Sequence, residues 1–190
     1  AYEGAEQLVV IPITGTLSGS FNAALLAGEE YRETHPDARI FVLDSLSAGP
    51  EIRLLAEKAR ELVNAGLDFD AVCEGLQAYQ KHTHLLFSLE SLANLARNGR
   101  VKPAVAAVAR MLGIRVIGQA SDGGLERIVL ELKGHGYTGG KVHIAHCGNP
   151  EAARRLQQMI HAVFHGAQVD VSECGGLCSY YAELGGLMVG

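Results

Sequence analysis

The sequence lacks the features that mark several large classes of protein. No block of lysine and arginine occurs in its 190 residues, and the formal net charge is −5, which argues against nucleic acid as the main partner. No apolar run reaches the ~20 residues that cross a bilayer, because charged residues interrupt every such stretch. The acidic start, residues 1–6, has no signal-peptide pattern, so we expect a cytoplasmic protein without a membrane span.

Cysteine is scarce, and its spacing fits neither a disulfide framework nor a common metal motif. Four cysteines do not cross-link a chain of this size. Cys174 and Cys178 are separated by three residues rather than two, although their thiols could meet on a helical turn. His143, His146 and Cys147 suggest metal ligands, but in a strand the two histidines point to opposite faces. We therefore expect buried or strand-end histidines, and neither a metal nor a cofactor.

The chain is organised around residues 8–24. Residues 8–13 predict a buried strand, and a loop of threonine, glycine and serine then leads into a helix over about 19–32. Free amides and the helix dipole favour an anion there, and hydroxyls add donors. Neither a Walker A loop nor a G-x-G-x-x-G motif is present, so a carboxylate fits better than a nucleotide phosphate. The alternative is a helix that Ser18 or Ser20 simply caps.

Strands and helices alternate along the sequence, which predicts an α/β fold. Strands at 8–13 and 39–43 flank the first helix and form a right-handed βαβ unit with a parallel pair. The ligand crevice of such sheets lies outside the carboxyl ends of the strands, where Ser18 and Ser45 fall. We expect Asp44 to cap a loop or helix rather than to act as a catalytic base, since no histidine follows nearby.

The rest of the chain predicts a second, mixed lobe. Asp122-Gly123-Gly124 predicts a hairpin turn, which would place Arg127 on a strand. We divide the chain into a parallel-sheet lobe, 1–80, and a mixed α/β lobe, 81–190, whose last stretch could pack back on the first lobe. The expected helices are 51–65, 68–82, 88–98, 102–112 and 150–165, and the expected strands are 84–88, 114–119, 125–132, 141–146 and 167–171.

Several motifs, in order along the chain, resemble those of the DegV family of bacterial fatty-acid-binding proteins. The matching segments are 14–24, which resembles S-S-x-L-S-G-T-Y-x-x-A, 42–45, similar to V-I-D-S, 98–101, similar to a G-G-R-I turn, and 185–190, similar to a closing glycine-rich strand. The family has a further segment before the strand at Leu8, with a D-S-T strand and a T-S-Q-P loop, and neither occurs here. The resemblance is therefore either to a fragment of a member or to an N-terminally shortened member, with a two-lobed α/β fold.

The resemblance implies binding without catalysis. A long-chain fatty acid would have its tail between the lobes and its carboxylate at the Ser18-Gly19-Ser20 loop, and it would be presented to a fatty acid kinase subunit for acyl phosphate formation. Tyr181 stands where many members have a histidine, and a phenol can donate a hydrogen bond but cannot carry a proton at pH 7 as histidine can. The expected ligand-binding residues are Thr14, Thr16, Ser18, Gly19, Ser20, Ser45, Arg100, Arg127 and Tyr181.

Other interpretations stay open for these residues and for the chain. Arg100 could instead bind the carbonyls that end the preceding helix, and Arg127 could simply face solvent. A hydrolase- or transferase-like enzyme would use Ser18 as the nucleophile on an acyl or phosphorylated substrate, but residues 16–20 do not match G-x-S-x-G and no His–Asp pair is suggested by spacing. A ligand-free interaction module is the third possibility.

Overall fold

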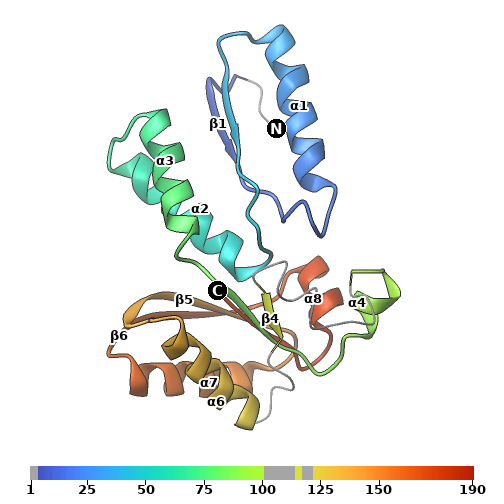
Figure 1. Ribbon diagram of the computed structural model, residues 1–190, viewed down its shortest axis with the longest axis vertical. Coiled ribbons are helices and arrows are strands. Elements are labelled where there is room, and N and C mark those ends of the chain that lie inside the picture. The colour runs from blue at the N-terminus through green and yellow to red at the C-terminus, as the bar shows by residue number, and fades with distance from the viewer. Residues whose placement is uncertain (1–3, 101–113, 117–121) are drawn as a thin grey trace. The chain divides into compact units, whose positions relative to one another are not determined.

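The computed structural model describes residues 4–100, 114–116 and 122–190 (Figure 1). The chain divides into two compact units, one formed by Ala1–Ala48 with Leu55–Thr83 and the other by Gly49–Leu54 with His84–Gly190. Each unit combines helices with a sheet, parallel in the first and mixed in the second. The predicted α/β class, with a parallel-sheet lobe and a mixed-sheet lobe, is therefore confirmed.

A parallel strand pair and the helix between its strands open the first unit. β1 (Gln7–Val10) pairs with β2 (Arg39–Val42), and α1 (Ser20–Thr34) connects them and lies beside them in Figure 1. This is the predicted βαβ unit. Because β1 and β2 run in the same direction, the loops that follow them, 11–19 and 43–49, lie at the same edge of the sheet.

Two further helices follow in the chain. α2 (Pro50–Asn64) ends just before Gly66, whose φ of +79° suits glycine at a helix end. α3 (Phe69–Gln80) begins after Asp68, whose side chain accepts a hydrogen bond from the amide of Ala71 at 2.9 Å. The core of the first unit joins α2, α3 and the strand pair through Leu43, Val72 and Leu76, with Val9, Ile11, Phe41, Ala59 and Leu62 packed against them.

A five-stranded mixed sheet forms the second unit, in the order β4-β3-β7-β5-β6. Its strands are β3 (Leu85–Ser88), β4 (Ile114–Val116), β5 (Gly139–His146), β6 (Gly166–Glu173) and β7 (Leu187–Val189). β3 is parallel to β4 and β5 is parallel to β6, whereas β7 is antiparallel to both of its neighbours. The last stretch, which we expected could pack back on the first lobe, contains β7 and pairs with β3 and β5 at the centre of this sheet.

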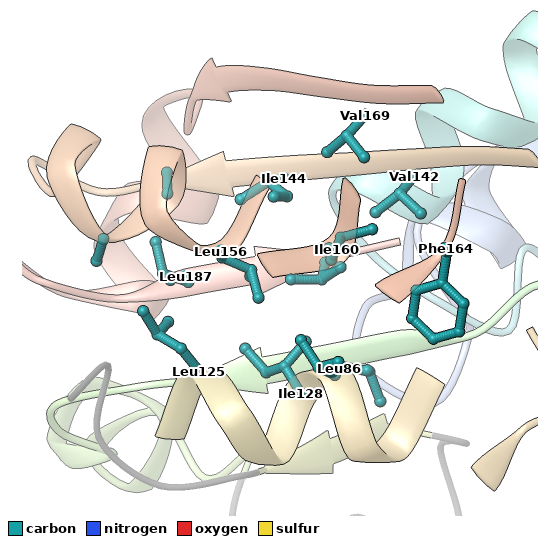
Figure 2. Close-up of a cluster of buried hydrophobic side chains, with 14 residues drawn as sticks. Leu86, Leu125, Ile128, Val142, Ile144, Leu156, Ile160, Phe164, Val169 and Leu187 are labelled. Atoms are coloured by element: carbon teal, nitrogen blue, oxygen red, sulfur yellow. The ribbon is translucent and has the colours of Figure 1, made fainter. Parts of the chain in front are cut away.

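Four helices of the second unit are described: α4 (Ala93–Arg97), α6 (Asp122–Gly134), α7 (Pro150–Val163) and α8 (Gly176–Ala182). Figure 2 shows α6 and α7 contributing side chains to one apolar cluster with the strands. Its buried members include Leu86, Leu125, Ile128, Val142, Ile144, Leu156, Ile160, Phe164, Val169 and Leu187. This cluster is the main core of the second unit.

The hairpin predicted at residues 122–124 is wrong, because residues 122–134 form helix α6. Leu125, Ile128 and Val129 are buried at i, i+3 and i+4, which is the spacing of one helical face. Arg127 is therefore on an exposed part of a helix and not on a strand. Burial of this apolar stripe against the sheet outweighs the local turn preference of the Asp-Gly-Gly sequence.

Most other predicted elements agree with the structure apart from their ends. The helix predicted at 102–112 lies outside the described residues, and of the strand predicted at 114–119 the structure describes β4, residues 114–116. The helix expected over 88–98 is shorter, at Ala93–Arg97. Among the residues that the structure describes, no helix combines the length and the apolar character that crossing a bilayer requires.

Candidate functional site

The predicted ligand loop lies in the first unit, where hydrogen bonds join the segment between β1 and α1 to the segment after β2. Thr14 donates its amide to the carbonyl of Ser47 at 2.9 Å, and Gly15 donates its amide to the Asp44 carboxylate at 3.3 Å. Leu43 donates its amide to the carbonyl of Val10, also at 2.9 Å, which extends the pairing of the two strands. The two segments are therefore fixed to each other at the carboxyl edge of the sheet.

Asp44 acts as a bridge between these segments. Its Oδ1 accepts from the amide of Gly15 and also from the amide of Leu46, at 3.0 Å. Leu46 has a φ of +53°, which is unfavourable for a leucine, so this hydrogen bond helps to hold a strained residue. Gln80 donates to the Asp44 carbonyl at 2.6 Å. The carboxylate caps the loop, as predicted. It accepts hydrogen bonds from backbone amides, which is a structural role and not that of a catalytic base.

Four hydroxyls form two pairs along the loop before α1. The Oγ1 atoms of Thr14 and Thr16 lie 3.0 Å apart, and the Oγ atoms of Ser18 and Ser20 lie 2.7 Å apart. Thr14 is buried, whereas Thr16 and Ser20 are exposed. In a pair of hydroxyls only one proton lies between the two oxygens, so each pair keeps a second proton that it can donate to an anion.

The N-terminus of α1 has no side-chain cap at its N-cap residue, Gly19. Ser18 instead accepts from the amide of Ser20 at 3.2 Å, which satisfies the first residue of the helix. The amides of Phe21 and Asn22 belong to the first turn, where the helix itself offers no acceptor. The alternative interpretation, in which a serine simply caps the helix, therefore accounts for the amide of Ser20 but not for the amides of Phe21 and Asn22.

Gly19 leaves space at this point. Its φ of −68° and ψ of 0° are open to any residue, so the backbone does not require glycine there. A Cβ atom added at Gly19 would meet no heavy atom within 4 Å. The absence of a side chain at Gly19 thus leaves open space beside the N-terminus of α1, and a bound anion would need such space.

Ser45 has a different environment from the other predicted hydroxyls. It is fully buried, it donates to the carbonyl of Ser47 at 3.0 Å, and it accepts from the amide of Ser47 at 3.2 Å. Its hydroxyl is therefore used within its own turn and shapes the loop. We did not predict the role of Ser47, whose carbonyl accepts from the amide of Thr14. Only the repeated serine in Ser45-Leu46-Ser47 could have indicated it.

Three predicted residues belong to the second unit. Arg100 is exposed, follows Gly99 at a φ of +70°, and donates from Nη1 to the carbonyl of Asn98 at 2.6 Å, so it binds the end of α4 as the alternative interpretation expected. Arg127 is exposed on α6. Tyr181 is half-buried on α8, with its ring edge-on to that of Tyr180 at 5.1 Å between centroids. Within the first unit, the structure thus groups the predicted loop residues.

The hydrogen bonds of Ser18 do not resemble those of a nucleophile. Its partners are the hydroxyl and the amide of Ser20, and neither is a general base. His143 and His146 are buried in β5, in agreement with the prediction of buried histidines, and Nε2 of His143 lies 2.9 Å from Oγ of Ser172. Across 4–100, 114–116 and 122–190, no three His, Cys, Asp or Glu side chains are grouped as metal ligands would be.

Comparison with known proteins points to one family. The family model described as "Uncharacterised protein, DegV family" matches residues 1–189. A DegV domain-containing protein of Streptococcus pneumoniae (strain ATCC BAA-255 / R6) is 41% identical over 204 aligned residues, which cover 100% of this chain and 73% of that protein. The chain is thus similar to a curated relative over its whole length.

Solved structures show the same likeness in three dimensions. The Streptococcus pneumoniae Fatty Acid Kinase (Fak) B3 protein, loaded with linoleic acid, matches with a TM-score of 0.93 and 37% identity over 99% of this chain and 72% of that one. A DegV family protein from Eubacterium eligens, loaded with heptadecanoic acid, matches with a TM-score of 0.87 and 35% identity over 99% of this chain and 73% of that one.

Proposed function

The chain belongs to the DegV family, and on that premise we propose that it binds a long-chain fatty acid whose carboxylate contacts the loop before α1. The observation that carries the proposal is the open space at Gly19, at the N-terminus of α1, together with the paired hydroxyls of Ser18 and Ser20. A carboxylate that leaves water needs such donors. Fatty acids bound in the two solved relatives support this ligand class.

The proposed contacts follow from the two hydroxyl pairs. Ser18 and Ser20 donate to the carboxylate, and the helix amides behind Gly19 add further donors. Thr14 and Thr16 form the second pair of the same loop. Burial of the acyl chain supplies most of the affinity, at ~0.8 kcal/mol for each CH₂ group. The roles of Ser45, Arg100, Arg127 and Tyr181 in binding rest on the family resemblance.

We propose further that the chain presents the bound acid to a fatty acid kinase, which phosphorylates the carboxylate, and that the chain itself supplies no catalytic group. Likeness to the Fak B3 protein supports this partner. The hydrogen bonds of Ser18 support binding rather than nucleophilic attack, since its partners are the hydroxyl and the amide of Ser20. The same loop would thus hold the acid by hydrogen bonds while another protein performs the chemistry.

Native mass spectrometry with added oleate tests the binding. We expect one fatty acid per chain, and Ser18→Ala should weaken the affinity about 10–100-fold, because a hydrogen bond to a charged group contributes about 1.5–3 kcal/mol. Thr34→Ala is a matched control, because it removes a hydroxyl at the opposite end of α1 and should leave binding unchanged. No uptake of oleate by the wild-type chain would favour an interaction module, and Ser18-dependent ester hydrolysis would favour an enzyme.

Gly19 offers a second test that leaves the hydroxyls in place. Gly19→Val fits the observed φ and ψ and its Cβ atom meets no neighbouring atom, so the fold should lose only about 1 kcal/mol, the cost of a poorer N-cap residue. The new side chain would cover the helix N-terminus, and we expect oleate binding to fall at least tenfold. Equal affinity in wild type and Gly19→Val, measured by calorimetric titration, would place the carboxylate elsewhere.

A further inference from the structure

The second unit contains a cluster of sulfur-bearing side chains that the proposed function does not use. Cys147, Cys174 and Cys178 are free, partly buried, and packed against one small apolar cluster. That cluster consists of Leu89, Ala145, Ala182 and Met188, so a fourth sulfur atom belongs to the same group. Three thiols in one cluster are more than packing requires, since any small apolar side chain would fill the same space.

The strand register places two of these cysteines opposite each other. β5 and β6 are parallel and pair His146 with Glu173, so the next pair in the same register is Cys147 with Cys174. The amide of Cys174 donates to the carbonyl of His146 at 2.9 Å, which extends the ladder to this position. Neighbouring strands lie about 4.8 Å apart, within the range of about 4.4–6.8 Å between the Cα atoms of a disulfide.

The side chains of this pair also lie on the same side of the sheet, because both contact the same apolar cluster. Sγ of Cys147 donates to the carbonyl of Ser179 at 3.6 Å, so this thiol lies beside α8, the helix that carries Cys178. Burial, with the thiols of Cys178 and Cys147, raises the pKa of Cys174 to about 12. Cys178 lies on α8, and its Sγ would be 3.6 Å from a Cβ added at Gly49. It is a third thiol beside the pair, on a different element.

We propose that Cys147 and Cys174 form a reversible intramolecular disulfide when the chain meets a peroxide. One thiol attacks a peroxide oxygen and becomes a sulfenic acid, and one water leaves. The second thiol then attacks the sulfenic sulfur, the S–S bond forms, and a second water leaves. Two thiols are oxidised and one hydrogen peroxide is reduced to two waters. Because the thiolate is the reactive form and burial disfavours it, the reaction is slow at neutral pH and faster at alkaline pH.

The bond would act on the segment between β6 and β7. Cys174 lies two residues before α8, and α8 and its end hold α4 in place. Asn94 of α4 donates its side-chain amide to the carbonyl of Tyr180 at 2.9 Å and its backbone amide to the carboxylate of Glu183 at 2.8 Å. A covalent tie at Cys174 thus stiffens the α4–α8 pair, and this effect does not depend on the proposed ligand.

The experiment uses the full chain treated with hydrogen peroxide and then alkylated with N-ethylmaleimide. We expect the intact mass before alkylation to be lower by two hydrogens, two of the four thiols to escape alkylation, and a non-reducing peptide map that joins Cys147 to Cys174. Dithiothreitol should restore all four thiols. The crosslink should vanish in Cys147→Ser and in Cys174→Ser, and it should persist in Cys73→Ser, a matched control in the first unit, and in Cys178→Ser.

Three results would overturn the proposal. Alkylation of all four thiols after treatment would show that no bond forms. A peptide map that joins Cys174 to Cys178 would place the disulfide at the wrong pair. A gain of oxygen on one cysteine without the loss of two hydrogens would show simple over-oxidation. The wild-type peptide map alone decides among these results, so the proposal stays testable if a serine variant does not fold.

Discussion

Single side chains fix the candidate loop, and Asp44 joins two of its segments. Its carboxylate accepts from Gly15 on one segment and from Leu46 on the other. A hydrogen bond to a charged acceptor contributes about 1.5–3 kcal/mol, although exposure reduces this. The loop also contains a leucine at a φ of +53°, so part of this energy offsets backbone strain. Loss of the carboxylate therefore removes one of the ties between the two segments.

We predict that Asp44→Ala lowers the free energy of unfolding by about 1–2 kcal/mol, because two amides lose a charged acceptor. Urea denaturation measures the change. Asp37→Ala, at an exposed position in the turn before β2, is the control and should change stability by less than about 0.5 kcal/mol. Equal effects of the two substitutions would mean that the Asp44 bridge is not formed in solution.

The residue types of the loop could be read from the sequence, but their pairing could not. Threonine, serine and glycine between a strand and a helix indicate hydroxyl donors near a helix N-terminus, and the structure contains them there. The tie between Thr14 and Ser47 joins residues far apart in the sequence, so no local pattern predicts it. We predicted Ser45 as a ligand-binding hydroxyl because it follows β2. Its buried hydroxyl instead donates to the carbonyl of Ser47 within its own turn.

At the scale of elements, strong end signals predicted helices well. Asn149 caps α7 by accepting from the amide of Ala152 at 3.3 Å, and Pro150 occupies the first turn, as its sequence position indicated. The prediction for residues 122–134 was wrong because Asp-Gly-Gly favours a turn locally, whereas the apolar spacing after it favours a helix. Packing of Leu125 and Ile128 into the core of the second unit decides between them, and local preference contains no information on that packing.

Gly123 provides a test of this correction. In a helix the substitution Gly123→Ala adds helix propensity and meets no neighbouring atom, so we expect stability to rise by about 0.5–1 kcal/mol. A hairpin turn with a positive φ at this glycine would give the opposite sign. Gly136→Ala is the control, because its φ of +76° should make alanine destabilising by about 1 kcal/mol. Thermal unfolding of both variants measures the difference.

At the scale of the whole molecule, we expect stability to fall at alkaline pH. Burial, with the thiols of Cys178 and Cys147, raises the pKa of Cys174 from 9.0 to about 12. Between these values the unfolded chain releases a proton that the folded chain keeps, so the free energy of unfolding decreases as pH rises above 9.0. The limit is about 1.4 kcal/mol per pH unit, and partial exposure of Cys174 reduces it.

Urea denaturation on both sides of this pH measures the slope. Below 9.0 both states keep the proton, and this thiol should contribute no pH dependence. Cys174→Ser removes the titrating group, so its stability should decrease less steeply above that pH than the stability of the wild type. Parallel curves for wild type and Cys174→Ser would contradict the assigned cause.

The position of β7 has a consequence for synthesis. Val189 pairs with Leu86 on one side and with Ile144 on the other, so residues 187–189 join two strand pairs that are otherwise separate. While the ribosome is still adding these residues, β3–β4 and β5–β6 can each form but expose open edges. The nascent second unit therefore contains two incomplete sheets until residues 187–189 are available to pair between them. During that interval it is most exposed to chaperones and to mispairing with neighbouring chains.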